Sequence, residues 1–213
     1  DEEFCKEVQK LGNFSFSLSL EGFEEANDGR RGEGIFQKVL SAMDLMKKYG
    51  LFFGTSVCYT RKNMDAVTSD EFYDLMIEHG CRYAWYFHYM PVGNEADVEL
   101  MPTMEQREWI YKRIREVRGW EGGKGIMLLD FQNDGEFVGG CIAGGRNYFH
   151  INANGDAEPA YLSITPEQIS VRTHCLSVCS SLYSWHTERD SLSMIIIFVP
   201  ARCWRIRRSC SRW

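Results

Sequence analysis

Polar side chains with useful chemistry follow the apolar stretches of this sequence, where strands are expected to end. Glu21 follows FSFSLSL, Thr60 and Asn63 follow LFFGTSVCY, and Asp130 closes GIMLLD. Carboxylates act as general acids or bases, and hydroxyl and amide groups orient polar ligands. Asp130 is the first candidate for an acid, a base or a substrate-positioning residue. Glu21 could contact a cofactor or substrate, or it could cap the loop that follows it.

The elements that carry these residues alternate between helices and strands over residues 1–131. Apolar residues at helical spacing predict four helices, EEFCKEVQKLG, IFQKVLSAMDLMKKYG, SDEFYDLMIEHG and TMEQREWIYKRIREVRGW. The third is expected to begin at Ser69 or Asp70 and to stop at Gly80, and the fourth opens with the capping-box pattern of Thr103 and Gln106. Apolar runs between the helices predict four strands, FSFSLSL, LFFGTSVCYT, RYAWYFHYM and GIMLLDF.

This alternation predicts an α/β fold with a parallel sheet, forming part of a (β/α) barrel. In such barrels the loops at the carboxyl ends of the strands hold the chemistry. Those loops are polar and mostly rich in glycine: EGFEEANDGRRGEG, TRKNMDAVTS, PVGNEADVELMPT and QNDGEFVGGC. Beyond Asn133 the pattern changes to short strands and turns, GEFVGG and NYFHINANGDAEP, which predict a small β-rich extension.

Charge, hydropathy and cysteine content limit the possible partners and the cellular location of the protein. Residues 1–159 hold 17 Lys and Arg against 27 Asp and Glu, and an acidic body of this kind argues against a nucleic-acid partner. No stretch approaches the roughly 18 apolar residues that a membrane-spanning helix needs. The beginning of the chain carries no signal-peptide pattern, so its cysteines favour a reduced, cytoplasmic setting.

Residues 160–213 differ in composition from the rest of the chain. All 19 Gly lie before residue 160, and the last 54 residues contain no Gly, Lys or Asn but 10 Ser, 7 Arg, 4 Cys and 3 Trp. Because turns rely on Gly and Asn, we interpret this segment as a frameshifted, non-native tail. The loss of one base after the Pro159 codon would turn a Cys codon into the codon of Ala160. A genuinely divergent tail is the alternative.

Four motifs follow one another along residues 1–159: SLSLEGFEEANDGRRGEGIF, SVCYTRKN, YFHYMPVG and GCIAGGRNYFHINANGDAEP. Together they resemble radical S-adenosylmethionine (radical SAM) enzymes with a SPASM-like C-terminal module for an auxiliary iron–sulfur cluster. The resemblance implies the C-terminal half of a radical SAM barrel at 1–132 and the start of the auxiliary module at 133–159. The tail at 160–213, which its composition marks as non-native, is the third segment.

The resemblance implies an enzyme that cleaves S-adenosylmethionine (AdoMet) reductively with a [4Fe–4S] cluster and performs radical chemistry, in many members on a peptide or protein. By the same resemblance, Ser19 and Arg31 face AdoMet, with Arg31 at its carboxylate. Thr60 and Asn63 bond its ribose or amino group, and Met90 flanks the adenine.

Each of these positions also has a structural interpretation. Arg31 could pair with a neighbouring acid, Glu24, Glu25 or Asp28. Asn63 could be an ordinary turn residue, and Met90 could belong to the core.

Cys141 is the candidate metal ligand, for the auxiliary cluster, because thiolates bind iron–sulfur clusters. A buried free cysteine is the alternative. The defining C-x3-C-x2-C of the family is absent and would lie upstream of Asp1, and Ala160 stands where the auxiliary motif has its last Cys. We therefore expect a fragment of a longer enzyme that is inactive as it stands.

Two other functions remain open from the residues alone. One is a non-catalytic α/β module that binds a small anionic ligand at the glycine-rich loops. The other is a metal-dependent barrel hydrolase that uses His88, Asp130 and His150.

Overall fold

The computed structural model describes residues 1–91, 96–119, 122–140, 150–151, 156–158, 169–170 and 195–198. The chain divides into two compact units. The first comprises Asp1–Asp134 with His186–Ile196, and the second comprises Gly135–Trp185 with Ile197–Trp213. None of the described helices is long and apolar enough to cross a membrane.

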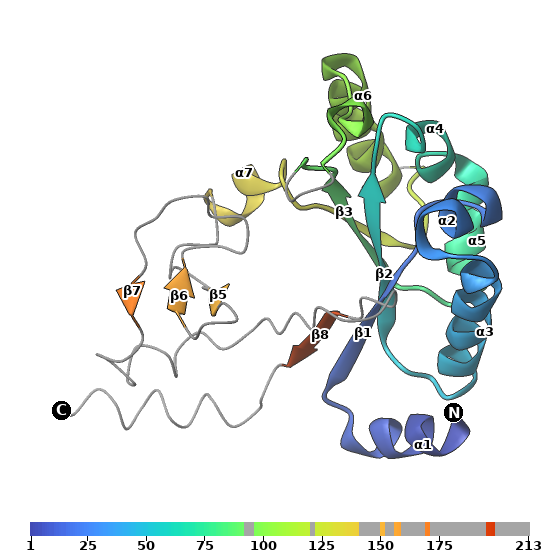
Figure 1. Ribbon diagram of the computed structural model, residues 1–213. Helices are drawn as coiled ribbons and strands as arrows, with labels where there is room; N and C mark the ends of the chain where they lie inside the picture. The colour runs from blue at the N-terminus through green and yellow to red at the C-terminus, as the bar shows by residue number, and fades with distance from the viewer. Residues whose placement is uncertain are drawn as a thin grey trace. The chain divides into compact units, whose positions relative to one another are not determined.

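Four parallel strands form the sheet of the first unit (Figure 1). They are β1 (Phe14–Ser19), β2 (Phe53–Tyr59), β3 (Tyr83–His88) and β4 (Met127–Asp130). Their order is β4-β3-β2-β1, and β8 (Ile195–Phe198) lies beside β1. Because the four strands are parallel, their carboxyl ends meet at one edge of the sheet. The predicted strands and their parallel arrangement are confirmed.

The helices of the first unit are α1 (Glu2–Leu11), α2 (Glu24–Arg31), α3 (Ile35–Lys48), α4 (Met64–Val67), α5 (Asp70–Glu78) and α6 (Met104–Arg118), with the short 3-10 turn η1 (Val98–Leu100). Four of them confirm the predicted helices. The other two, α2 and α4, lie in segments expected to be loops. The sequence of α2 has no apolar face, and its favourable features are acids in the first turn and Arg30 and Arg31 in the last, which suit the helix dipole.

Local signals begin and end these helices as expected. Thr103 and Gln106 form the capping box of α6, with each side chain bonded to the other residue's backbone N–H. The Ser69 hydroxyl accepts a hydrogen bond from the Phe72 N–H at 3.2 Å at the start of α5. Gly80 follows α5 with a φ of 87°, a conformation that favours glycine.

One face of the sheet builds the core. The register aligns Leu18, Thr55, Ala84 and Leu128 across the four strands, and all four are buried. The Thr55 hydroxyl donates to the sulfur of Met76 at 3.1 Å, which places α5 over this face. Each large apolar side chain that is fully buried here stabilises the fold by roughly 1.5–3 kcal/mol.

The opposite face carries smaller and aromatic side chains. Ser19, Ser56, Trp85 and Leu129 form one row across it. Phe131 contacts the rings of Trp85 and Phe87, with its centroid 4.8 Å from that of Phe87.

Gly54 is required where β2 meets β3. A Cβ added at Gly54 would collide with the ring and the carbonyl oxygen of Tyr83, its partner in the register. The Tyr83 hydroxyl also donates to the Phe16 carbonyl oxygen at 2.9 Å, so this ring crosses β2 and ties β3 to β1.

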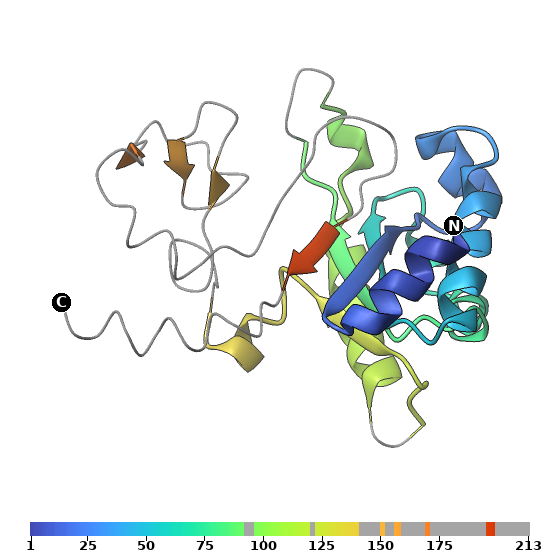
Figure 2. The ribbon, with the colours of Figure 1, turned by 90° about the horizontal axis from the view of Figure 1, so that it is seen from below.

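The second unit contains α7 (Gly135–Val138) and a three-stranded antiparallel sheet. The strands are β5 (His150–Ile151), β6 (Asp156–Glu158) and β7 (Ile169–Ser170), side by side in that order (Figure 2). The expectation of short strands is confirmed for β5 and β6 but is wrong for GEFVGG, which forms α7. The two following glycines, Gly139 and Gly140, have positive φ and end this helical turn. The three predicted segment boundaries stay predictions.

Candidate functional site

A buried carboxylate lies at the carboxyl edge of the sheet. Glu21 follows β1 and is 1% exposed. Its Oε1 accepts hydrogen bonds from Nε of Arg31 at 3.1 Å and from Nη2 of the same residue. Its Oε2 accepts from Nη1 of Arg30 at 2.9 Å and from the backbone N–H of Cys58 at 3.1 Å. The four acceptor positions of the carboxylate are thus all used.

Helix α2 places both arginines beside this carboxylate. Gly22 has a φ of 123° and turns the chain from Glu21 into α2. The Asn27 side-chain oxygen accepts from the Glu21 backbone N–H at 3.1 Å, so α2 folds back over the strand end. Asp28 then accepts from the N–H groups of Gly34 and Phe36 at 2.6 and 2.8 Å. The Phe36 hydrogen bond is the largest cause of the lowered pKa of Asp28.

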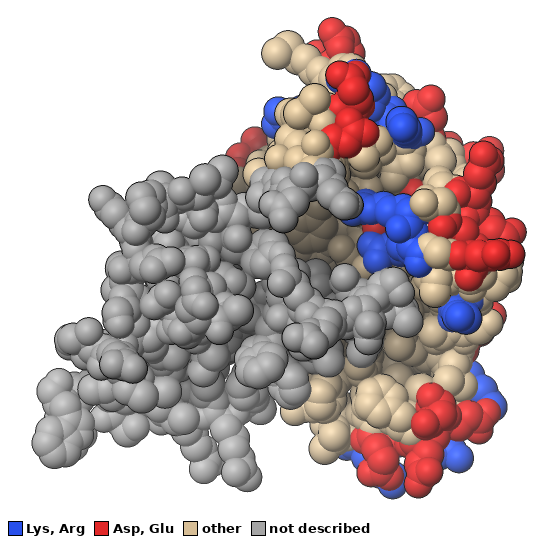
Figure 3. Space-filling model, in the orientation of Figure 1, with Lys and Arg blue, Asp and Glu red and all other residues tan. Residues whose placement is uncertain are grey.

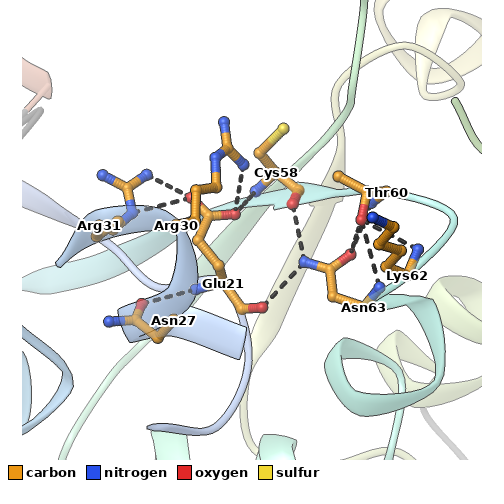
Figure 4. A network of polar contacts seen from close by, with 8 residues as sticks. All are labelled: Glu21, Asn27, Arg30, Arg31, Cys58, Thr60, Lys62 and Asn63. Carbon is orange, nitrogen blue, oxygen red and sulfur yellow. Dashed lines mark hydrogen bonds and ion pairs between the residues drawn. The ribbon is translucent and has the colours of Figure 1, made fainter. Parts of the chain in front are cut away.

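The loop after β2 joins the same network (Figure 4). Asn63 accepts from the N–H and the hydroxyl of Thr60 at 2.7 and 3.0 Å, which makes a tight turn. Its side-chain amide donates to the carbonyl oxygens of Glu21 at 2.9 Å and Cys58 at 3.1 Å. One turn residue therefore connects the ends of β1 and β2.

The network carries an excess of positive charge. One carboxylate faces two guanidinium groups, and the side chains of Arg30 and Arg31 are 44% and 14% exposed. Burial is the largest single influence and lowers the pKa of Arg30, but the charge of Glu21 and the smaller contributions of Cys58 and Tyr89 together outweigh it, so the pKa of Arg30 is raised. Figure 3 shows basic side chains exposed near the middle of this face of the described part, with acidic side chains nearer its margin.

Cys58 lies beside Arg30 and is half-buried. Burial raises the pKa of its thiol, and the charge of Arg30 works in the opposite direction. The thiol is therefore protonated at neutral pH and is a weak nucleophile in this state.

Four of the predicted site residues, Glu21, Arg31, Thr60 and Asn63, meet in this network. Arg31 pairs with Glu21 rather than with the neighbouring acids considered for it from the sequence. Asn63 is a turn residue, as the structural alternative held, and it also bridges two strand ends.

The other predicted site residues, Ser19, Met90 and Cys141, are not among the residues of the Glu21 network described above. Ser19 is buried at the end of β1, in register with Ser56. Met90 is 38% exposed, so its interpretation as a core residue is wrong. Cys141 lies outside the described residues, and so does the side chain of His150.

A second polar cluster surrounds Asp130 at the end of β4. Both carboxylate oxygens of Asp130, which is fully buried, accept from the Asn133 amide at 2.9 Å. Burial is the largest cause of its raised pKa, and the charge of Asp134 acts in the same direction. Asp134 in turn forms two hydrogen bonds with Arg118, at 2.8 and 3.1 Å.

Two polar side chains near Asp130 lie on the same face of the sheet. Tyr59 and His88 are partners in the register. Their rings meet edge to face, with the ring centroids 6.2 Å apart. The Tyr59 hydroxyl and Nδ1 of His88 are buried and have no hydrogen-bond partner among the described residues. Burial raises the pKa of Tyr59 and lowers that of His88, so both side chains are neutral at neutral pH.

The register places Asp130 beside Tyr86, on the helix-covered face of the sheet, whereas Cys58 lies on the opposite face. The Asp130 cluster and the Glu21 network therefore occupy different faces. Among the described residues no group of three or more His, Cys, Asp or Glu side chains could hold a metal ion.

Comparison with solved structures relates this fold to AdoMet-bound radical SAM enzymes. The structure "Native anSMEcpe with bound AdoMet" matches with a TM-score of 0.56 at 16% sequence identity, over 79% of this chain and 50% of that chain. The same enzyme with AdoMet and the Kp18Cys peptide gives a TM-score of 0.58 at 16% identity, over 80% and 51% of the two chains. SuiB of Streptococcus suis bound to S-adenosylmethionine gives 0.50 at 15% identity, over 75% and 40%.

The described α/β part of the chain thus has a fold consistent with part of a radical SAM enzyme. The chain spans about half the length of the anSMEcpe structures that it matches. No family model and no curated protein matches its sequence.

Sequence reasoning missed three members of the network, Arg30, Asn27 and Cys58. Arg30 adjoins the predicted Arg31, but only the helical geometry of α2 directs both side chains to Glu21. The signal available in the sequence was a pair of adjacent arginines at the end of a short segment with acids at its start.

Proposed function

We propose that this chain is part of a radical SAM enzyme and that the Glu21 network forms part of its AdoMet-binding site. The observation that carries the proposal is the network itself: a buried carboxylate holds two guanidinium groups at the carboxyl edge of a parallel sheet. The structural likeness to AdoMet-bound enzymes supports the choice of ligand.

The charge of the network suits AdoMet. AdoMet has an amino-acid part whose carboxylate would be attracted by the uncompensated guanidinium charge, because guanidinium pairs with carboxylate in a planar, bidentate manner. Thr60 and Asn63 would lie near its ribose or amino group, Ser19 near its amino-acid part and Met90 near the adenine. Glu21 would keep the arginines in place. When bound and reduced, AdoMet supplies the 5′-deoxyadenosyl radical in enzymes of this class.

The proposal places the ligands of the reducing [4Fe–4S] cluster outside the described residues, since those residues contain no candidate metal group. Cys141 would be a ligand of an auxiliary cluster in a SPASM-like module that begins near residue 133. Ala160 would mark the frameshift and the loss of a further ligand. The chain as it stands would then bind AdoMet without cleaving it.

The proposed substrate is a peptide or protein handled in the cytoplasm. One matched structure contains a peptide together with AdoMet, which is a property of that enzyme and supports the choice here. The acidic charge of residues 1–159 supports the proposal that nucleic acid is not the partner. Asp130 is the sequence-based candidate for an acid, base or substrate-positioning residue, but it lies on the face of the sheet opposite Cys58 and the Glu21 network, so this proposal gives it no contact with AdoMet.

A hydrolase is the second candidate function. The observation that favours it is the cluster of Tyr59, His88 and Asp130 at the ends of three adjacent strands, with two unpartnered polar atoms. A zinc-dependent hydrolase would need a third metal ligand from outside the described residues. Purified protein with stoichiometric zinc would favour this function over the first.

The test is to sequence the encoding DNA across the Pro159 codon and for several hundred bases upstream of the Asp1 codon. We expect a C-x3-C-x2-C sequence upstream and a restored Glu-Pro-Cys after insertion of one base. An intact frame without three upstream cysteines would contradict the proposal. Equilibrium dialysis of the full chain with labelled AdoMet, against ATP as the control ligand, then tests whether the site binds AdoMet.

A further inference from the structure

Three apolar side chains are exposed in the segment between β3 and α6. Val98 lies in η1 and is 60% exposed, Met101 follows η1 and is 41% exposed, and Met104 begins α6 and is 82% exposed. The Met101 N–H donates to the Val98 carbonyl oxygen at 3.1 Å, a bond between residues i and i+3 that places both side chains on one side of the turn. Three residues of chain span at most about 11 Å, so Met104 lies near them. We call these three residues the η1 surface.

Arg61 fixes the backbone that carries the η1 surface. Its N–H donates to the Leu100 carbonyl oxygen at 2.9 Å, and its Nε donates to the Met101 carbonyl oxygen at 3.1 Å. Its Nη1 pairs with Glu99 at 3.2 Å. Pro102 is buried. The loop is thus held in one conformation that keeps the η1 surface exposed, and exposed apolar side chains gathered in this way are typical of an interaction surface.

The η1 surface lies at the rim of the candidate site. Its segment follows β3, so it lies at the carboxyl edge of the sheet, as the Glu21 network does. Arg61 directly follows Thr60, which bonds to Asn63 within that network. A molecule bound on the η1 surface would therefore lie beside one bound at the Glu21 network.

The charges around the η1 surface are mainly negative. Asp97, Glu99, Glu105 and Glu108 are exposed, and Arg107 is the one basic residue between positions 97 and 108. An acidic rim repels nucleic acid and anionic lipid, and it also disfavours a second copy of this chain, whose formal net charge is −6. The partner that complements the η1 surface is both apolar and basic.

We infer that the η1 surface binds a polypeptide segment that combines apolar and basic side chains. Methionine side chains are flexible and polarisable and adapt to partners of different shape, and the surrounding acids attract Lys and Arg. The assignment of this segment to the substrate rests on the proposed function, whereas the binding itself does not. On that function, the segment anchors the substrate at the rim while another part of it reaches the AdoMet site.

The experiment measures the fluorescence anisotropy of labelled peptides mixed with the full chain, without AdoMet. The first probe is a peptide of Lys and Leu with the leucines at helical spacing. Glu replaces every Lys in the second probe, and Ser replaces every Leu in the third. The double variant Met101→Gln/Met104→Gln tests the apolar contact. Its matched control is Met127→Gln, because Met127 is 50% exposed at the opposite, amino edge of the sheet.

A second double variant, Glu105→Gln/Glu108→Gln, tests the acidic rim. Its matched control is Glu3→Gln/Glu7→Gln, because these acids are likewise exposed and lie at the start of α1 as the first pair lies at the start of α6. Circular dichroism melting measures the folding of each variant. Val98→Gln takes the place of the methionine variant if that variant melts at a lower temperature.

We expect the unaltered chain and both controls to bind the first probe about 10-fold or more tightly than the second and third probes. The methionine variant should weaken binding of the first probe by about 10-fold, since it removes two apolar contacts. The glutamate variant should weaken it by about 3-fold or more at low salt, and this loss should disappear at about 1 M NaCl, where exposed charges are screened.

Equal binding of the first and second probes would overturn the inference, and so would equal weakening by the methionine variant and Met127→Gln. Loss of peptide binding while AdoMet still binds in equilibrium dialysis would overturn this inference alone. Peptide binding at the η1 surface of a chain that does not bind AdoMet would support the inference and remove only its assignment to the substrate.

Discussion

The side-chain amide of Asn63 donates a hydrogen bond of 2.9 Å to the carbonyl oxygen of Glu21, a residue 42 positions earlier in the chain. The same amide donates to the Cys58 carbonyl at 3.1 Å. The end of β1 is thereby joined to the turn after β2, on the edge where Glu21 holds its two arginines. The geometry of the candidate site thus depends on the bridge that Asn63 forms between the two strand ends.

Replacement of Asn63 by Asp should destabilise the fold. The carboxylate keeps an acceptor for Thr60 but removes both donors, which leaves two carbonyl oxygens without this partner. Loss of such buried bonds costs about 2 kcal/mol or more. Urea unfolding measures the change, and Asn13→Asp on the exposed surface should change stability by less than about 0.5 kcal/mol. Equal effects of the two substitutions would contradict the bridging role.

Replacement of Tyr59 by Phe should stabilise the fold, whereas Tyr86→Phe should destabilise it. Both side chains are fully buried, but the Tyr59 hydroxyl has no partner among the described residues and the Tyr86 hydroxyl donates to the Val67 carbonyl at 2.7 Å. Removal of an unsatisfied buried hydroxyl raises the free energy of unfolding by about 1 kcal/mol, and removal of a hydrogen-bonded one lowers it by about as much. If urea unfolding finds both variants equally destabilised, Tyr59 has a partner.

Replacement of Gly54 by Ala should be far more costly than replacement of Gly29. A Cβ on Gly54 collides with the backbone and ring of Tyr83, and overpacking of this kind costs about 1–3 kcal/mol. Gly29 lies in α2 with nothing within 4 Å of an added Cβ, so Gly29→Ala should gain about 0.5–1 kcal/mol through helix propensity. Thermal melting should show a lower melting temperature for Gly54→Ala and a higher one for Gly29→Ala. An unchanged melting temperature for Gly54→Ala would mean that Tyr83 of β3 does not lie against Gly54.

The stability of the protein should contain a pH-dependent contribution from Asp130. Burial raises its folded-state pKa above the ordinary value of 3.8, so the folded state binds the proton more tightly than the unfolded state. The contribution is fully present below about pH 4 and is lost as the pH rises through the folded pKa.

Asp130→Asn should remove this contribution and keep an acceptor for Asn133. The difference in unfolding free energy between the variant and the unaltered chain should therefore change with pH above about 4, in favour of the variant. Urea unfolding between pH 4 and pH 7 measures it. A difference that is constant over this range would mean that the pKa of Asp130 is not raised.

Much of the fold could be predicted because its signals are local. The capping box of Thr103 and Gln106 and the stop at Gly80 act within a few residues, and the apolar spacing of α3 and α6 selects a helix over a strand. Helix α2 was missed because it has no apolar face. The four-residue helix α7 was missed because the segment GEFVGG that contains it has the apolar content of a short strand.

The amino-acid sequence by itself determined the alternation of strands and helices, the parallel sheet and the presence of polar residues at the strand ends. Only the tertiary structure decided which of these residues meet. Glu21 reaches Cys58 across 37 positions and Asn63 across 42, distances that no local pattern encodes. The register likewise set Asp130 on the helix-covered face and Cys58 on the other, because side chains alternate along a strand and the pairing of neighbouring strands fixes which face each one shares.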